Sequence, residues 1–176
     1  MVIFGRFCLQ KNHEFLIELF SSFIKKGNNS KLILIGNGPL ENDIKEKVKK
    51  MNLQDNVIFK EVIKNVPEYL QAMDVLVMPS IYEGLPLVGV EAQAASLPCV
   101  FSKEITREVN ISNECFFIKN NEIGQWINKC EELKNLNRYK IRKNENCKTF
   151  DINYSSKELE KLYDEIWNKE NHLESK

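Results

Sequence analysis

The stretch DVLVMPSIYEGLPLVGVEAQAASLPCVFS, residues 74–102, contains the pattern that is most informative about the fold. It opens with a continuous apolar run, passes through a helix-forming segment at 86–96, and closes with a second apolar run. Continuous apolar runs are typical of strands buried on both faces, and a helix between two of them is typical of a parallel βαβ unit. The same stretch places two glutamates, Glu83 and Glu91, in an almost wholly apolar setting.

The alternation of strands and helices continues on both sides of this stretch. Further apolar runs predict strands at residues 2–5, 31–38, 56–62 and 115–119. Helical spacing of apolar residues predicts further helices at 13–26, 39–51, 66–73, 121–135 and 155–170. We therefore predict an α/β fold: a doubly wound, Rossmann-like parallel sheet with helices on both faces, which binds its ligand beyond the carboxyl ends of the strands.

Length and composition predict one domain, residues 1–170, followed by a frayed tail at 171–176. The 176 residues include 25 basic and 25 acidic side chains, so the chain lacks the net positive charge that would favour nucleic acid as a partner. No apolar run approaches the roughly 20 residues of a membrane span. The five cysteines are never closer than 15 residues, which gives no metal or redox pair and predicts reduced, packing thiols in the cytoplasm.

The segment GRFCLQKN follows the first predicted strand and contains the first candidate binding residues. Gly5 allows close approach of the backbone to a ligand, and Arg6 and Lys11 are suited to a diphosphate. The alternative is that both cations are solvated loop charges. Asn12 is expected to cap the next helix, and His13 is expected to have a cap or surface role in preference to a catalytic one.

The segment GNGPLE follows the second predicted strand and begins like a dinucleotide-binding fingerprint. Gly36 and Gly38 match the first two glycines, but Glu41 stands where the third is required. We therefore expect a tight turn that lines a ligand cleft, with no NAD implied.

The segment EGLP begins the helix of the opening stretch. The amides of Gly84 and Leu85, with Pro86 near the first helical turn, predict an anion site with Glu83 at its mouth. Glu91 is expected to lie five residues into the helix, about 7.5 Å further along at 1.5 Å per residue. The helix is apolar or small nearly all round, so we expect it to be buried. A buried carboxylate needs hydrogen-bond donors such as sugar hydroxyls; the alternative is a small solvent gap or a lysine partner.

Two patterns mark the last predicted helix. Ser155 and Glu158 have the spacing of a capping box at its start. Tyr163 and Trp167 are separated by one helical turn and are expected to form a packing stripe.

Three segments together, GRFCLQKNHEFLI, LILIGNGP and AMDVLVMPSIYEGLPLVGVEAQAASLPCV, resemble the group 1 glycosyltransferases, retaining enzymes of family 4 with the GT-B fold. The sequence of these segments most resembles bacterial capsule and exopolysaccharide enzymes. The resemblance runs over residues 2–102 and more loosely to 167, and it covers the C-terminal, donor-binding half of a two-domain enzyme. Glu83 and Glu91 fit the E-x7-E motif of this family.

The resemblance implies a role for each candidate residue. Gly5, Arg6 and Lys11 would hold the diphosphate, with the two cations stabilising the charge of the leaving group. Glu83 would contact the transferred sugar, and Glu91 the ribose hydroxyls. The other residues implied in donor binding are Gly36, Gly38, Gly84, Leu85 and Pro86, and residues 56–62 would lie against the base.

The resemblance also implies partners. The substrate would be a nucleotide-diphosphate sugar, most often a UDP-sugar, and neither a cofactor nor a metal is expected. An N-terminal acceptor domain would complete the cleft, so the chain alone is expected to be inactive. A lipid-linked acceptor would place the full-length enzyme at the inner face of the membrane.

The sequence departs from the family pattern at two positions and leaves two alternative functions open. Ser96 stands where the family usually has glycine, which puts the turn before Pro98 in doubt, and Glu61 leaves the preferred base open. One alternative is a non-catalytic Rossmann-like module that binds a nucleotide or sugar phosphate. The other is a flavodoxin-like signalling domain, but such a domain would want an acidic cluster where this chain has Gly5 and Arg6.

Overall fold

A six-stranded, wholly parallel sheet forms the centre of the computed structural model, which describes residues 1–173. The strands are β1 (Val2–Phe4), β2 (Leu32–Ile35), β3 (Val57–Lys60), β4 (Leu76–Met78), β5 (Cys99–Ser102) and β6 (Cys115–Ile118). Their order is β3-β2-β1-β4-β5-β6, the order of a doubly wound Rossmann fold with its switch point between β1 and β4. The predicted fold is confirmed, and a flavodoxin-like order, 2-1-3-4-5, is excluded.

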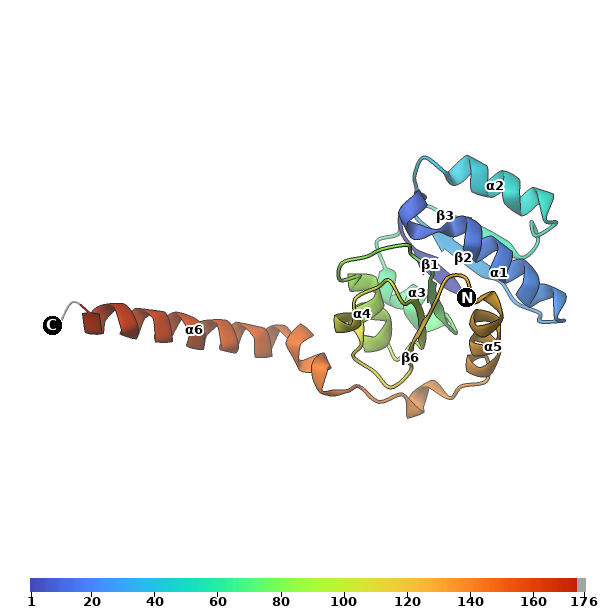
Figure 1. The fold of residues 1–176 in the computed structure, drawn as a ribbon. Coiled ribbons are helices and arrows are strands. Elements are labelled where there is room, and N and C mark those ends of the chain that lie inside the picture. The colour runs from blue at the N-terminus through green and yellow to red at the C-terminus, as the bar shows by residue number, and fades with distance from the viewer. Residues whose placement is uncertain (174–176) are drawn as a thin grey trace.

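Helices cover both faces of the sheet (Figure 1). They are α1 (His13–Lys25), α2 (Glu41–Lys50), α3 (Val66–Ala72), α4 (Leu87–Ala94) and α5 (Ile123–Leu133). A further helix, α6 (Ile152–Leu173), follows them in the chain. The loops also contain short 3-10 turns: η1 (Leu9–Lys11), η2 (Arg107–Val109), η3 (Arg138–Lys140) and η4 (Glu145–Phe150). The predicted helices and strands are all present, with small differences at their ends.

The core has two layers because side chains alternate along each strand. Ile3, Leu34 and Val77 belong to the layer under α1, α2 and α5. Phe4 and Phe101 belong to the layer that packs against α3 and α4. The sheet is therefore apolar on both faces, and its two ends are the places where polar groups can gather.

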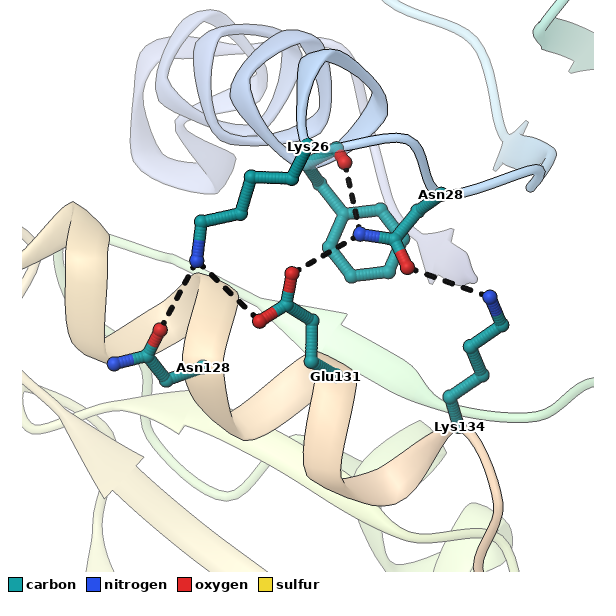
Figure 2. A network of polar contacts seen from close by, with 6 residues as sticks. Lys26, Asn28, Asn128, Glu131 and Lys134 are labelled. Carbon is teal, nitrogen blue, oxygen red and sulfur yellow. Dashed lines mark hydrogen bonds and ion pairs between the residues drawn. The ribbon is translucent and has the colours of Figure 1, made fainter.

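A polar network joins the end of α1 to α5 at the amino ends of the strands (Figure 2). Glu131 accepts hydrogen bonds from Lys26 at 3.3 Å and from Asn28 at 3.1 Å. The Asn28 amide nitrogen also donates to the carbonyl of Phe23, and Lys134 donates to the Asn28 side-chain oxygen. The network fixes the turn after α1 against α5 on the side of the sheet away from the strand ends that carry the candidate residues.

The end of α4 keeps its shape although Ser96 replaces the glycine of the family pattern. Ser96 adopts a left-handed conformation with φ 55°, and its amide donates to Gln93. The next amide, of Leu97, donates to the carbonyl of Ala92, as in a Schellman cap. Arg138 adds hydrogen bonds to the carbonyls of Ala95 and Ser96, so the turn before Pro98 is intact.

Helix α6 extends away from the rest of the molecule (Figure 1). It begins three residues earlier than predicted and is capped by Asp151, whose carboxylate accepts from the amides of Asn153 and Tyr154. The predicted capping box at Ser155 is therefore wrong, because that residue already lies inside the helix. No helix among residues 1–173 is long and apolar enough to cross a membrane.

The predicted packing stripe on α6 is also wrong. Tyr163 is 64% exposed and Trp167 is 68% exposed, because the sheet and its helices lie away from this part of the chain. The predicted tail begins at residue 171, where α6 continues to Leu173, and residues 174–176 lie outside the described part of the chain.

Candidate functional site

The candidate residues meet at the carboxyl ends of β1, β2 and β4, which include the switch point of the sheet. Gly5 and Arg6 directly follow β1, and the loop of residues 79–86 connects β4 to α4. Parallel strands all end on this edge, so segments distant in sequence come together there.

The glycines at this edge are required by contacts within the chain. Gly36 has φ 146°, and a Cβ there would lie 2.1 Å from the carbonyl oxygen of Gly5. Gly38 has φ 158°, and its Cβ would lie 2.5 Å from the carbonyl oxygen of Phe7. The predicted tight turn is present, but the close approach that needs these glycines is between the turns that follow β1 and β2.

A pocket of about 760 Å³ opens beside this contact. Its walls include the predicted Gly5, Arg6, Gly36 and Gly38, together with Phe4, Ile35, Asn37, Pro39, Val62, Ile63 and Val66. Ile63 and Val66 were missed by sequence reasoning; they follow β3, so their place at the carboxyl end of a strand is the signal that could have found them. Of the predicted segment 56–62 only Val62 reaches the pocket, and exposed Glu61 does not line it.

Arg6 lies between this pocket and a second one of about 460 Å³. The second pocket is lined by Cys8, Leu9, Gln10, Leu40 and Tyr82, with Arg6 and Pro39 shared between the two. Arg6 is exposed, so its guanidinium can be reached from solvent. Within the described part of the chain, the walls of the two pockets contain no carboxylate side chain. The Arg6 guanidinium between them is therefore suited to binding an anion.

Lys11 and Glu83 contact each other across the switch point. The Lys11 Nζ atom lies 2.5 Å from the Glu83 Oε1 atom, and the two side chains are only 16% and 11% exposed. The family resemblance implied a diphosphate ligand for Lys11 and a sugar for Glu83, and the pairing of the two was not predicted. The pair ties the turn after β1 to the loop after β4.

Glu91 lies on the fifth residue of α4, as predicted, but it is exposed. The helix is not buried all round: Leu87, Glu91 and Ala94 face solvent at helical spacing, while Gly89 and Gln93 face the core. The small residues misled the prediction, because they are compatible with either face. The carboxylate of Glu91 is therefore hydrated and needs no ligand to offset the cost of burial.

The chain matches known proteins in sequence and in structure. The family model described as "Glycosyl transferases group 1" matches residues 1–150. The chain belongs to the group 1 glycosyltransferases.

Among curated relatives of this group 1 glycosyltransferase, a putative glycosyltransferase EpsF of Bacillus subtilis is 44% identical over 106 residues, 60% of this chain and 28% of the relative. An Escherichia coli UDP-Gal:alpha-D-GlcNAc-diphosphoundecaprenol alpha-1,3-galactosyltransferase is 35% identical over 130 residues, 70% of this chain and 33% of the relative. The match therefore spans about a third of each relative's length.

Among solved structures, the GT-B enzyme TarM of Staphylococcus aureus, crystallised as a point mutant with fondaparinux, alpha-GlcNAc-glycerol and UDP, superposes with a TM-score of 0.71. The two chains are 25% identical, and the match covers 77% of this chain and 28% of TarM. The architecture of this group 1 glycosyltransferase is thus that of one Rossmann-like part of a GT-B enzyme.

Gln93 fixes α4 in this glycosyltransferase and was missed by sequence reasoning. Its amide nitrogen donates to the carbonyls of Gly89 and Val109 at 2.9 and 2.7 Å. Its oxygen accepts from the Ile111 amide at 2.9 Å and from Ser112 at 3.1 Å. A buried amide with both ends paired holds the helix that begins at the candidate anion site.

His13 is buried, so the predicted surface role is wrong. The residue is 3% exposed, and its ring stacks on Phe7 with centroids 4.5 Å apart. Both ring nitrogens are without a hydrogen-bond partner in the described chain. Burial, together with the nearby charge of Lys11, lowers the pKa of His13 to about 4, so the ring is neutral at pH 7.

All five cysteines are free thiols. Burial raises the pKa of Cys99, and it raises the pKa of Cys115 and of Cys130 to about 12. These three thiols are therefore protonated at neutral pH and unsuited to nucleophilic chemistry. Within residues 1–173 the structure contains no group of three or more His, Cys, Asp or Glu side chains placed to hold a metal ion.

Proposed function

We propose that this domain binds the donor, a UDP-sugar, for a retaining glycosyltransferase that builds bacterial surface polysaccharide. The observation that carries the proposal is the 760 Å³ pocket with apolar walls and Arg6 on its rim, at the carboxyl ends of β1 and β2. An apolar pocket suits the flat faces of a nucleobase, and a guanidinium at its mouth suits the attached phosphates.

In this proposal the nucleoside occupies the pocket formed by Val62, Ile63 and Val66, with the diphosphate at Gly5 and Arg6. Exposed Glu91 accepts hydrogen bonds from the ribose hydroxyls. Gly36 and Gly38 shape the wall through their contacts with the turn after β1. The Arg6 guanidinium can donate charged hydrogen bonds to phosphate oxygens, and the Glu91 carboxylate can accept hydrogen bonds from hydroxyl groups.

The transferred sugar is assigned to the loop that connects β4 to α4. Glu83 would contact the sugar, while the amides of Gly84 and Leu85, before Pro86, would bind phosphate or sugar oxygens. A bond forms between the anomeric carbon and the acceptor hydroxyl as the bond to the phosphate oxygen breaks, and the hydroxyl proton passes to that departing oxygen. Arg6 and Lys11 would stabilise the negative charge that develops there.

The relatives support the choice of substrate class. The name of the Escherichia coli relative includes a UDP-sugar donor and a diphosphoundecaprenol-linked acceptor, and TarM was crystallised with UDP. Since the match spans about a third of each relative, we propose that an N-terminal acceptor domain completes the cleft and that the domain alone is inactive. A lipid-linked acceptor would bring the complete enzyme to the cytoplasmic face of the membrane.

Calorimetric titration of the 176-residue chain with UDP, UDP-glucose, UDP-galactose and UDP-N-acetylglucosamine tests the proposal. Arg6→Ala is expected to weaken UDP binding by roughly 10- to 100-fold, because charged hydrogen bonds contribute about 1.5–3 kcal/mol. Lys25→Ala, which removes a charge at the far end of α1, is the matched control and is expected to bind UDP normally.

The ribose contact has its own matched pair. Glu91→Gln is expected to weaken UDP binding about tenfold, whereas Glu46→Gln, an exposed glutamate on α2, is expected to leave it unchanged. Absence of binding by the unmodified chain, or equal affinities in the Arg6 and Lys25 variants, would contradict the proposal.

A further inference from the structure

We propose that Asn12 and Asn120 are positioning residues that set the loop carrying Glu83. The inference rests on the proposed function, because it concerns how that loop is held toward the sugar. Neither asparagine lies in the wall of either pocket at this edge or in the segment 79–86.

Both asparagines bind the same backbone carbonyl. The Asn12 Nδ2 atom donates to the Pro79 oxygen at 3.1 Å, and the Asn120 Nδ2 atom donates to it at 3.0 Å. The Asn120 Nδ2 atom also lies 3.4 Å from the backbone carbonyl oxygen of Ser80. A carbonyl has two lone pairs, so the two amides satisfy it fully and fix the direction in which the chain leaves β4.

The turn after β1 binds the rest of the loop residue by residue. The Ile81 amide donates to the Gln10 carbonyl at 2.8 Å, and the Gln10 side chain donates to the Tyr82 carbonyl at 3.1 Å. Lys11 then pairs with Glu83 at 2.5 Å. Four of the five residues from 79 to 83 are thus tied to residues 10–12, and Asn120 approaches from the end of β6.

The backbone of Asn12 explains why this residue type stands there. Asn12 has φ 53°, a left-handed conformation that asparagine tolerates better than most side chains. The side-chain amide of Asn12 reaches across to Pro79 from that conformation. A glycine would adopt the same backbone but would lose the contact.

The edge also contains polar atoms that are buried without a partner. Among the described residues these are the Ser80 hydroxyl, the side-chain oxygen of Asn120 and the two nitrogens of His13. Unpaired buried polar atoms reduce stability, and two of these four belong to Ser80 and Asn120, residues of the Pro79 contact.

The first test measures the loop without any ligand. In the 176-residue chain, hydrogen exchange at the amides of residues 80–85 is expected to be at least about fivefold faster in Asn12→Gly and in Asn120→Ala. Asn28→Ala, which removes an amide donor to Phe23 and Glu131 at the other end of the sheet, is the matched control and should leave this loop unchanged. Unaltered exchange in both loop variants overturns the proposal.

The second test separates sugar from nucleotide. Asn12→Gly and Asn120→Ala are expected to weaken binding of UDP-galactose about fivefold while UDP affinity changes less than about twofold, and Glu83→Gln should abolish the difference. Equal losses for both ligands, or none, overturn the positioning role. If the unmodified chain binds neither ligand, the proposed function fails, and the exchange result still decides whether the asparagines hold the loop.

Discussion

The two ends of the sheet are built in different ways. At the amino ends of the strands, charged side chains of Lys26, Glu131 and Lys134 form a partly solvated network with Asn28 between α1 and α5. At the carboxyl ends, backbone contacts backbone through glycine, and buried polar atoms such as that of Ser80 lack partners among the described residues. Stability is distributed over replaceable surface contacts at one end, while the other end depends on a few positions with little freedom to change.

The largest difference between the two ends is expected from glycine substitutions. Gly36→Ala should reduce the free energy of unfolding by more than about 4 kcal/mol, because the new Cβ would lie 2.1 Å from the Gly5 oxygen. Gly27→Ala at the amino end has open space around it and only its φ of 86° to strain, so about 1–2 kcal/mol is expected. Urea unfolding of both variants measures the difference. Equal losses of stability would show that the two ends of the sheet do not differ in their need for glycine.

Acid is expected to destabilise the protein through His13, which lies near the carboxyl end of the sheet. His13 has its pKa lowered from 6.5 to about 4, so the unfolded chain binds a proton that the folded chain does not in this range. Stability therefore falls as the pH falls from above 6.5 toward 4, by up to about 3 kcal/mol. In His13→Phe this contribution should be absent, which urea unfolding at about pH 7 and about pH 4.5 would show. A variant that keeps the full pH dependence of the parent chain would assign the effect to other groups.

A smaller effect is expected from the network at the amino end. Glu131→Gln removes a charge shared by Lys26 and Asn28, and exposed pairs of this kind contribute about 0.2–1 kcal/mol. The loss should shrink when salt is raised, since the carboxylate is partly solvated. Thermal unfolding at low and high salt measures it, and UDP affinity serves as the control. A loss of UDP affinity would show that the two ends of the sheet are coupled, which would contradict their independence.

An effect of similar size and opposite sign is expected at the end of α4. Ser96→Gly should raise the free energy of unfolding by about 0.5–1 kcal/mol, because glycine adopts the left-handed conformation at φ 55° without strain. The neighbouring Ala95→Gly lies at φ −80° and should instead be destabilising by a similar amount. Urea unfolding compares the two, and a gain in neither or in both would contradict the assignment.

Much of the candidate edge was predictable because its signals are local. A glycine that follows an apolar run, as Gly5, Gly36 and Gly38 do, marks the end of a buried strand, and parallel strands end together. The pairing of Lys11 with Glu83 was not predictable, since 72 residues separate the two. The exposure of Glu91 was predicted wrongly because the small residues of α4 fit a buried face or a solvated one equally well.

Hydrophobic periodicity and turn chemistry act over a few neighbouring residues, so the order of strands and helices, the glycine turns and the family could be predicted from the sequence alone. The environment of each side chain depended on tertiary packing. His13 became buried and Tyr163 exposed, and Asn120 met a carbonyl 41 residues away. Such contacts depend on which strands lie side by side and on how the crossovers pack, and these are properties of the whole chain.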